Sequence, residues 1–308
     1  MEIALQFGLL VLGFVMLAKG ADWFVEGAAG IAMRFGIPQL VIGLTIVAMG
    51  TSAPEAAVSI AAAVKGNADI TIGNIVGSNI LNILVILGLA ASIVPIAVAR
   101  STVRIEIPFM IGVTALLFYQ GRDGSISLVD GGVLMVAFAV YMMYLYTMAM
   151  KSNVDSDLEE PGLPLGRCLL GAVGGLALII AGSNVTVGAA TSIATYAGLS
   201  ERFIGLTIVA LGTSLPELFT SVAAARRGNA DIAIGNIVGS NIFNILFVVG
   251  LSALIIDIPF ASAFNFDTYV ALGAAVLLWL CVLRTQRLQR WAGALMLVCY
   301  AAYLGYIL

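Results

Sequence analysis

The chain has 308 residues, of which 61% are hydrophobic and only 10% are charged. A soluble protein carries roughly a quarter of its residues as charged side chains, so this composition excludes a soluble domain. It predicts an all-α protein that crosses a membrane many times. The net charge of −3, without any basic run, gives no support for a nucleic-acid partner, and the absence of histidine excludes Ser–His catalysis and histidine-bound metals.

Polar breaks divide the chain into about ten apolar segments, most of which approach or exceed the ~20 residues that cross a bilayer as a helix. The first segment lacks a basic start and a small-residue cleavage site, so we interpret it as a retained span and not as a signal peptide. The first and sixth segments are long enough to be strongly tilted or to extend past the bilayer. We expect spans near residues 3–33, 37–64, 70–95, 104–120, 127–150, 165–196, 200–225, 232–256, 267–284 and 290–307.

One polar stretch, residues 151–164, is the only linker that the composition indicates. It separates a first half, 1–150, from a second half, 165–308, and each half holds five expected spans. The acidic cluster from Asp155 to Glu160 within the linker is interpreted as a solvated connection and not as a site. Three widely spaced cysteines match no disulfide or metal pattern and are expected to pack in the apolar core. They are Cys168, Cys281 and Cys299.

The two halves contain an internal repeat. Residues 43–84 recur at 205–246 with a constant offset of 162, and 32 of these 42 positions are identical without a gap. Because each half has an odd number of spans, the second half enters the membrane from the opposite side. Equivalent spans then run in opposite directions, as in the inverted repeats of many secondary transporters.

The loops differ in positive charge, and this difference predicts the orientation of the chain. Ten basic residues fall in the loops after odd-numbered spans, whereas the other side holds only Lys65, Arg122 and Arg202. Cytoplasmic loops carry the excess of lysine and arginine, so both termini are expected to face away from the cytoplasm. The ten are Arg34, Arg100, Arg104, Lys151, Arg167, Arg226, Arg227, Arg284, Arg287 and Arg290.

A proline and a carboxylate lie together inside the second span, in the sequence GTSAPE. Pro54 has no N–H to donate, so the helix is expected to kink or break there. Carbonyls such as that of Ala48 are expected to lose their partners, which a membrane tolerates only where protein, water or an ion replaces them. Thr51 and Ser52 share a helix face with Glu55, and together these oxygens suit Na⁺ or Ca²⁺. The second copy repeats the set with Ala210, Thr213, Ser214 and Glu217.

The span that follows each copy adds a polar stripe, because its Asn and Ser residues recur every four positions on one helix face. Asn79 and Asn241 lie beside this stripe, and the sequence leaves open whether they line a site or hold helices together. The glycines between them allow helices to approach closely. The stripe consists of Asn74, Ser78 and Asn82 in the first half and of Asn236, Ser240 and Asn244 in the second.

The two repeated glutamates are the strongest functional candidates. A carboxylate at this depth destabilises a membrane protein, on the order of several kcal/mol, and therefore indicates a functional site by default. A kinking proline or a row of small residues is, in contrast, common in membrane helices without a site. Asp22 and Glu26 in the first span could line an ion path, but Asn184 occupies the position equivalent to Asp22, so a carboxylate is not required twice.

These residues resemble the calcium/cation antiporter superfamily, specifically its sodium/calcium exchanger branch. The resemblance rests on two alpha-repeats, GTSAPE…GNIVGSNILN and GTSLPE…GNIVGSNIFN, in a chain of two five-span halves. It implies a ten-span exchanger of Ca²⁺ and Na⁺ whose cation sites lie between the second, third, seventh and eighth spans. The long first and sixth spans resemble the pair that slides to alternate access. No cofactor is implied.

By motif position, the resemblance also implies a set of ligands. The glutamates Glu55 and Glu217 would bind the divalent cation, with the flanking hydroxyls, amides and carbonyls around them. The other implied ligands are Thr51, Ser52, Thr213, Ser214, Ser78, Asn82, Ser240, Asn244 and the carbonyls of Ala48 and Ala210.

Two features depart from the pattern of this branch. Many of its exchangers carry an aspartate where this chain has Asn244, so the formal charge of the site here is −2, from Glu55 and Glu217 alone. One Ca²⁺ neutralises that charge, whereas three Na⁺ would leave an excess of one, which leaves the sodium stoichiometry open. The short linker 151–164 also has no room for the cytosolic calcium-sensing domains of animal exchangers.

Three other functions compete with Na⁺/Ca²⁺ exchange as explanations of these residues. A Ca²⁺/H⁺ antiporter could use the same glutamates, because burial favours the protonated form of a carboxyl group. An intramembrane enzyme could use them as an acid pair, but the surrounding hydroxyls and amides suit ion binding better. A passive channel would arise more naturally from a symmetric oligomer. We expect the protein to be an exchanger and not an enzyme. We expect it to lie in a prokaryotic inner membrane and to need no obligate protein partner.

Overall fold

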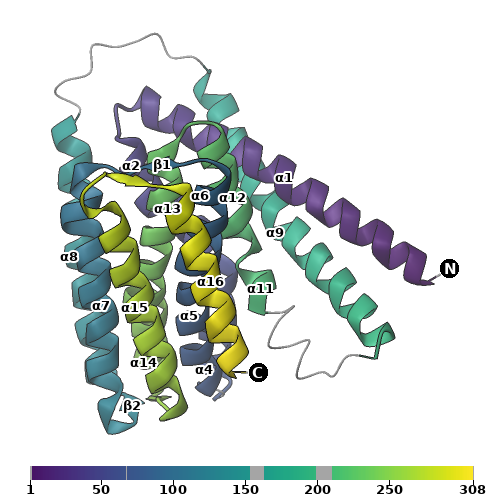
Figure 1. Ribbon diagram of the computed structural model, residues 1–308. Coiled ribbons are helices and arrows are strands. Elements are labelled where there is room, and N and C mark those ends of the chain that lie inside the picture. Colours follow the sequence, from purple (N-terminus) through teal and green to yellow (C-terminus); the bar gives the residue numbers. More distant parts are fainter. Residues whose placement is uncertain (1, 67, 153–162, 199–209, 308) are drawn as a thin grey trace.

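The structure is a computed structural model that describes residues 2–66, 68–152, 163–198 and 210–307 (Figure 1). Within these residues almost all regular structure is helical, which confirms the predicted all-α class. The acidic cluster at 155–160 and residues 200–209 of the expected seventh span lie outside the described residues.

The two halves contain similar series of elements, in which η marks a π-helical turn, apart from the 3₁₀ turn η4. The first half consists of α1 (Glu2–Arg34), α2 (Gln39–Ile42), η1 (Gly43–Val47), α3 (Ala48–Thr51), α4 (Ala53–Val64), α5 (Asp69–Leu81), η2 (Asn82–Leu87), α6 (Gly88–Ile93), β1 (Ile96–Ala97), η3 (Thr102–Glu106), α7 (Ile107–Gln120), η4 (Gly121–Asp123), β2 (Ser125–Ile126) and α8 (Leu128–Ser152). The described second half consists of α9 (Leu165–Tyr196), α11 (Ala210–Thr213), α12 (Leu215–Arg226), α13 (Ala230–Phe243), η6 (Asn244–Val249), α14 (Gly250–Ile255), β3 (Ile258–Pro259), α15 (Ala263–Leu283), β4 (Arg287–Leu288) and α16 (Arg290–Ile307).

The helices agree with the expected spans. Among the described residues, eight helices are long and apolar enough to cross a membrane, and a bent pair over residues 39–64 brings the number up to nine. The expected spans 165–196 and 290–307 coincide with α9 and α16. Of the remaining span, expected at 200–225, only the part from α11 onward is described.

The second span is broken, as its proline predicts. Helix α3 ends at Thr51 and α4 begins at Ala53. The axes of the segments 39–51 and 53–64 differ by 51°. Pro54 lies in the first turn of α4, where its missing N–H removes no helical hydrogen bond. The Ala48 carbonyl still accepts the backbone N–H of Ser52 at 3.0 Å. The expectation that this carbonyl loses its partner is therefore wrong, because the helix ends one turn after it.

The third and eighth spans form the centre of the molecule. The best window of the span made by α5, η2 and α6 is 78% buried, and that of the span made by α13, η6 and α14 is 83% buried. In contrast, the windows of α1, α8 and α16 are only 17–22% buried, which leaves most of their apolar side chains to face lipid. The polar stripe of the sequence thus lies on the two helices that are most shielded from lipid.

Two short strand pairs make the inverted symmetry visible. Strand β1 pairs with β4, and β2 pairs with β3, so each pair joins one half to the other. Ile96 of β1 and Ile258 of β3 are equivalent at the 162-residue offset, as are Ser125 of β2 and Arg287 of β4. The two pairs are therefore copies of each other, and β1 and β2 lie at opposite ends of the helix bundle (Figure 1).

Helices α1 and α9 form a separate layer, which runs obliquely beside the other helices (Figure 1). Glycines spaced by seven along α1 allow the two helices to touch. A Cβ atom at Gly20 would lie 2.9 Å from the Gly175 carbonyl oxygen, and one at Gly27 would lie 2.4 Å from the Ala172 nitrogen. Small residues give such close helix contacts in membranes.

This contact predicts a sharp difference between two glycines of one helix. Gly20→Ile should push α1 and α9 apart and lower stability by about 1–3 kcal/mol, as overpacking does elsewhere. Gly8→Ile is the matched control, because a Cβ at Gly8 meets nothing within 4 Å. The thermal unfolding midpoint of the purified protein in detergent measures both changes. Equal midpoints for the two variants would contradict the close packing at Gly20.

Candidate cation-binding site

The repeated motifs bring two carboxylates into the centre of the bundle. Glu55 lies in the first turn of α4 and Glu217 in the first turn of α12, and each is 1% exposed. Both follow a helix break, so the positive ends of the α4 and α12 dipoles lie next to them. The described residues contain no group of three or more carboxylate, thiol or imidazole side chains that could hold a metal ion, so the two glutamates depend on neutral oxygens around them.

Each glutamate is held by hydroxyls of the other half. Ser52 Oγ donates to Glu217 Oε1 at 2.8 Å, and Ser214 Oγ donates to Glu55 Oε1 at 3.3 Å. Both serines are buried at the break between two helices. Hydrogen bonds to charged groups are stronger than those between neutral groups. The two halves are therefore joined through their most polar residues.

The threonines of the motifs reinforce this arrangement. Thr213 interacts with the Glu55 carboxylate, and Thr51 interacts with that of Glu217. Thr51 Oγ1 also contacts the Asn236 side-chain oxygen at 3.0 Å and the Ala48 carbonyl at 3.3 Å. That carbonyl also accepts a hydrogen bond from Ser240 Oγ at 3.4 Å.

A pair of asparagines fixes the orientation of two further amides. Asn79 and Asn241 donate to each other's backbone carbonyls at 3.2 and 3.1 Å, which confirms that they hold helices α5 and α13 together. Their side-chain oxygens accept the amide groups of Asn244 and Asn82 at 3.1 and 2.9 Å. With both NH₂ groups turned toward these partners, the amide oxygens of Asn82 and Asn244 point away from them.

Four buried oxygens are left without a hydrogen-bond partner at the centre. They are Oε2 of Glu55 and Glu217 and Oδ1 of Asn82 and Asn244, two equivalent atoms from each half. Buried polar atoms almost always have partners, and these four can only accept once the glutamates are ionised. A set of carboxylate and amide oxygens is the ligand type of hard cations such as Ca²⁺.

The structure brings most of the predicted ligands together and leaves a few undetermined. Ser78 and Ser240 are buried on the two central helices. The side chain of Ala210 and the chain before it lie outside what the structure describes, so the Ala210 carbonyl stays a prediction. The ligand roles of all these residues are predictions.

Two serines belong to the site region and were missed in the sequence. Asn74 Nδ2 donates to Ser59 Oγ and Asn236 Nδ2 to Ser221 Oγ, both at 2.9 Å. The same amides also contact the backbone carbonyls of Glu55 and Glu217 at 3.3 and 3.4 Å. Asn74 and Asn236 thus hold the glutamate-bearing helices in place. The missed signal was present, since each serine follows its glutamate by four residues in both copies.

Asp22 and Glu26 do not belong to this centre. Arg227 binds Asp22 Oδ1 at 3.3 Å and Glu26 Oε2 at 3.0 Å, and all three side chains are about a third to a half exposed. These ion pairs join α1 to the end of α12 at the surface. The suggestion that Asp22 and Glu26 line an ion path is therefore not supported, because an arginine from the other half already forms ion pairs with both carboxylates.

Comparison with known proteins agrees with the geometry. The family model described as sodium/calcium exchanger protein matches residues 5–147 and 168–308. The inner membrane protein YrbG of Escherichia coli is 41% identical over 260 residues, 80% of this chain and 79% of that protein. The sodium/calcium exchanger MaX1 of Methanosarcina acetivorans is 33% identical and covers 98% of both chains.

Solved structures show the same likeness. The structure matches the sodium-calcium exchanger NCX_Mj, soaked with zero Na⁺ and Ca²⁺, with a TM-score of 0.87 and 33% sequence identity, over 99% of this chain and 100% of that chain. This match supports the expected architecture of two inverted five-helix repeats, including the span that is described here only in part.

The asparagine pair predicts an effect at a distance from the unpartnered oxygens. Asn79→Ala removes the acceptor that orients Asn244, and we expect the Ca²⁺ concentration for half-maximal thermal stabilisation to rise about tenfold, as for other residues that orient ligands. Thr114→Ala is the control, because among the described residues the Thr114 hydroxyl bonds only to Met110 of its own helix. An unchanged Ca²⁺ response in the Asn79 variant would contradict the orienting role.

Proposed function

The chain belongs to the sodium/calcium exchanger family, and we propose that it exchanges Ca²⁺ for Na⁺ across the membrane as a secondary antiporter with alternating access. One observation carries this proposal: Glu55, Glu217, Asn82 and Asn244 each keep one buried, unpartnered oxygen. The elements that carry these residues contact each other across the two halves, α4 with η6 and α12 with η2. No covalent chemistry is required of such a site, so the chain acts as a transporter and not as an enzyme.

Charge explains how one site couples two ions. Two ionised glutamates in a region shielded from water repel each other and favour any cation that binds between them. One Ca²⁺ neutralises the formal charge of −2, and departure of Ca²⁺ restores it. Na⁺ ions that bind to the same oxygens neutralise the negative charge of the site again. Each ion therefore leaves readily only when the other replaces it.

The hydroxyl groups provide additional ligands for the replacing ions. The hydroxyls of Ser52 and Ser214 donate to the glutamates while keeping oxygen lone pairs free. Thr51 and Thr213 lie beside the same carboxylates. We assign these four side chains, Ser78, Ser240 and the carbonyls of Ala48 and Ala210 to the cation sites. The mechanism uses Ca²⁺ and Na⁺ as substrates and requires no cofactor.

The two-layer arrangement supplies a route to alternating access. Helices α1 and α9 contact each other along most of their length, and their main contact with the rest of the described molecule is through α12, which carries Glu217. The halves are inverted copies, so displacing the α1–α9 layer in either direction opens equivalent paths on opposite sides. We expect the halves 1–150 and 165–308 to act as the two repeat units, with 151–164 as their linker.

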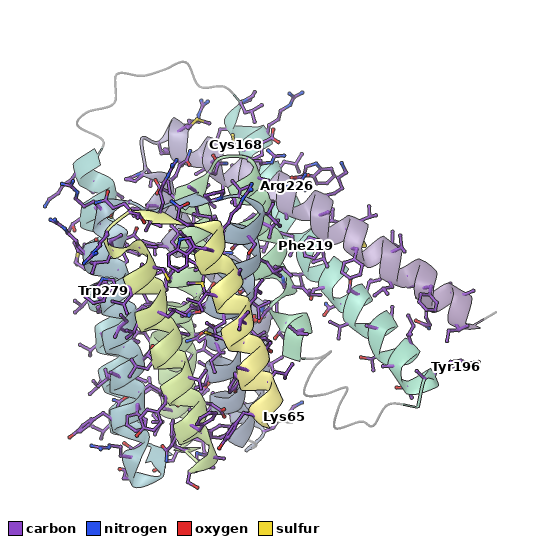
Figure 2. The ribbon with its side chains drawn as sticks, in the orientation of Figure 1. Lys65, Cys168, Tyr196, Phe219, Arg226 and Trp279 are labelled. Carbon is purple, nitrogen blue, oxygen red and sulfur yellow. The ribbon has the colours of Figure 1, made fainter. Side chains whose placement is uncertain are left out.

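The distribution of arginines supports an orientation in the membrane. Arg226 lies at one end of the molecule together with Cys168, whereas Lys65 and Tyr196 lie at the other (Figure 2). The end that carries Arg226 also carries the loops rich in arginine. By the positive-inside rule, this end faces the cytoplasm and both termini lie outside it. The name of the Escherichia coli relative supports a prokaryotic inner membrane, in which lipid is the only required partner.

Calcium uptake into proteoliposomes tests the proposal directly. An outward Na⁺ gradient should drive uptake, whereas an outward proton gradient of equal size should not. Glu55→Gln and Glu217→Gln should each abolish the Na⁺-driven uptake, because each removes half of the site's charge. Asp123→Asn, at an exposed turn, is the control and should transport normally.

Three outcomes would overturn parts of this assignment. Uptake driven by the proton gradient alone would identify a Ca²⁺/H⁺ antiporter. Full activity in both glutamine variants would exclude Glu55 and Glu217 from the site. Flux of Ca²⁺ without any counter-ion gradient would indicate a channel.

Asn244 predicts a change in coupling. Asn244→Asp changes the formal charge of the site from −2 to −3 and removes the amide group that donates to Asn79 Oδ1. We expect the charge moved per Ca²⁺, or the preference between Na⁺ and Ca²⁺, to change. Transport currents recorded with reconstituted protein measure both quantities. Coupling identical to that of the unmodified chain would make this position peripheral.

A further inference from the structure

A second buried carboxylate lies outside the exchange site. Glu106, at the end of η3, is fully buried within the fourth span. Tyr144 of α8 donates its phenol O–H to Glu106 Oε1. The other carboxylate oxygen, Oε2, is buried without any hydrogen-bond partner. An ionisable residue inside a membrane span indicates a function by default.

Two more oxygens lie near this carboxylate. Thr102 is fully buried one helical turn before Glu106, and its hydroxyl interacts with the carboxylate. The phenol oxygen of Tyr141, one turn before Tyr144 on α8, is also buried without a partner and faces the same charge. Unpartnered oxygens on a buried carboxylate and on a neighbouring phenol exceed what buried groups usually leave open.

The backbone at this point resembles the backbone at the exchange site. Of the four π-helical turns in the described residues, η2 and η6 begin at the ligands Asn82 and Asn244, and η1 leads into Ala48. The fourth, η3, ends at Glu106. Short π-helical turns inside helices are frequent at functional sites. Trp279 Nε1 donates to the Val103 carbonyl at 2.9 Å and holds η3 against α15.

We propose that Glu106, Tyr144, Tyr141 and Thr102 form a second cation site, which takes one monovalent cation of the size of Na⁺ and is separate from the Glu55–Glu217 site. The oxygen ligands suit a hard cation. One carboxylate balances one positive charge, whereas a divalent ion would leave an excess charge buried among tyrosine rings. The described residues form no ion pair with Glu106, and Arg104 of the same turn is exposed.

The site lies near the end of its span and is linked by contacts to the exchange site. Arg100 is exposed and Ser101 half-buried, and a helical rise of about 1.5 Å per residue puts Glu106 roughly 9 Å from Arg100. Helices α7 and α8 both contact η6, which begins at Asn244. The ring of Phe138 on α8 lies 5.3 Å from that of Phe247 in η6.

The second half does not repeat this site. Thr268 occupies the position equivalent to Glu106, and the helix there, α15, has no π-helical turn. The neighbouring Asp267 does accept a hydrogen bond from Tyr303 at 2.8 Å, but it is only partly buried. Asp267 therefore offers a matched carboxylate–tyrosine pair without the buried, unpartnered oxygens.

Sodium-dependent stabilisation of the purified full chain tests the proposal. The background variant Glu55→Gln/Glu217→Gln removes both charges of the exchange site. In this background, NaCl should raise the thermal unfolding midpoint by several degrees relative to choline chloride at equal ionic strength, because a bound ion stabilises the folded state. Adding Glu106→Gln should abolish that rise, whereas adding Asp267→Asn should leave it intact.

A milder variant keeps the test decisive if the combined variants fold poorly. Tyr144→Phe alone retains the carboxylate and loses one ligand, so the Na⁺ concentration for the half-maximal shift should increase about three- to tenfold. A full Na⁺ response with Glu106→Gln present would overturn the proposal. So would a Glu106→Gln substitution that itself raises the unfolding midpoint by the same amount in NaCl and in choline chloride, since that result identifies a protonated carboxyl group. The absence of a Na⁺ response in the background variant would also overturn it, because it leaves only bound water.

Discussion

Two hydrogen bonds between the halves, from Ser52 to Glu217 and from Ser214 to Glu55, are the interactions on which the structure depends. A carboxylate inside a membrane requires polar neighbours, and each half supplies those neighbours for the other. The helices must break beside the glutamates to present these hydroxyls, and the central spans must be shielded from lipid. The burial of the third and eighth spans and the bend of 51° in the second span follow from this one requirement.

The duplication gives the chain its symmetry, and small departures from symmetry give the halves separate roles. The strand pairs β1–β4 and β2–β3 are copies of each other at opposite ends of the bundle. Asp22 and Arg227, however, form an ion pair that the other half cannot form, since Asn184 replaces the acid. Glu106 likewise faces two tyrosines where the second half has Thr268. Function common to both halves lies at the centre, and the differences lie outside it.

Much of the site could be read from residues 43–84 and their copy. Proline beside a carboxylate, with hydroxyls one turn away, predicted both the helix break and the oxygen cluster. The sequence did not predict that Ala48 keeps its hydrogen bond, because the position of a break depends on the local backbone. It also left the role of Asn79 and Asn241 open, because an amide that joins two helices and an amide that binds an ion have the same chemistry. Only the direction of the NH₂ group distinguishes the two roles.

The sequence by itself determined the class, the number of spans, the duplication and the two glutamates, because apolar length, repeat offset and buried charge are properties of local sequence. Only the tertiary structure decided which hydroxyl contacts which carboxylate and which four oxygens of the site stay without a partner. It also decided that Arg227 forms ion pairs with Asp22 and Glu26. These pairings join residues that lie between 159 and 205 positions apart. Helix packing sets such distances, and no periodicity along the chain encodes them.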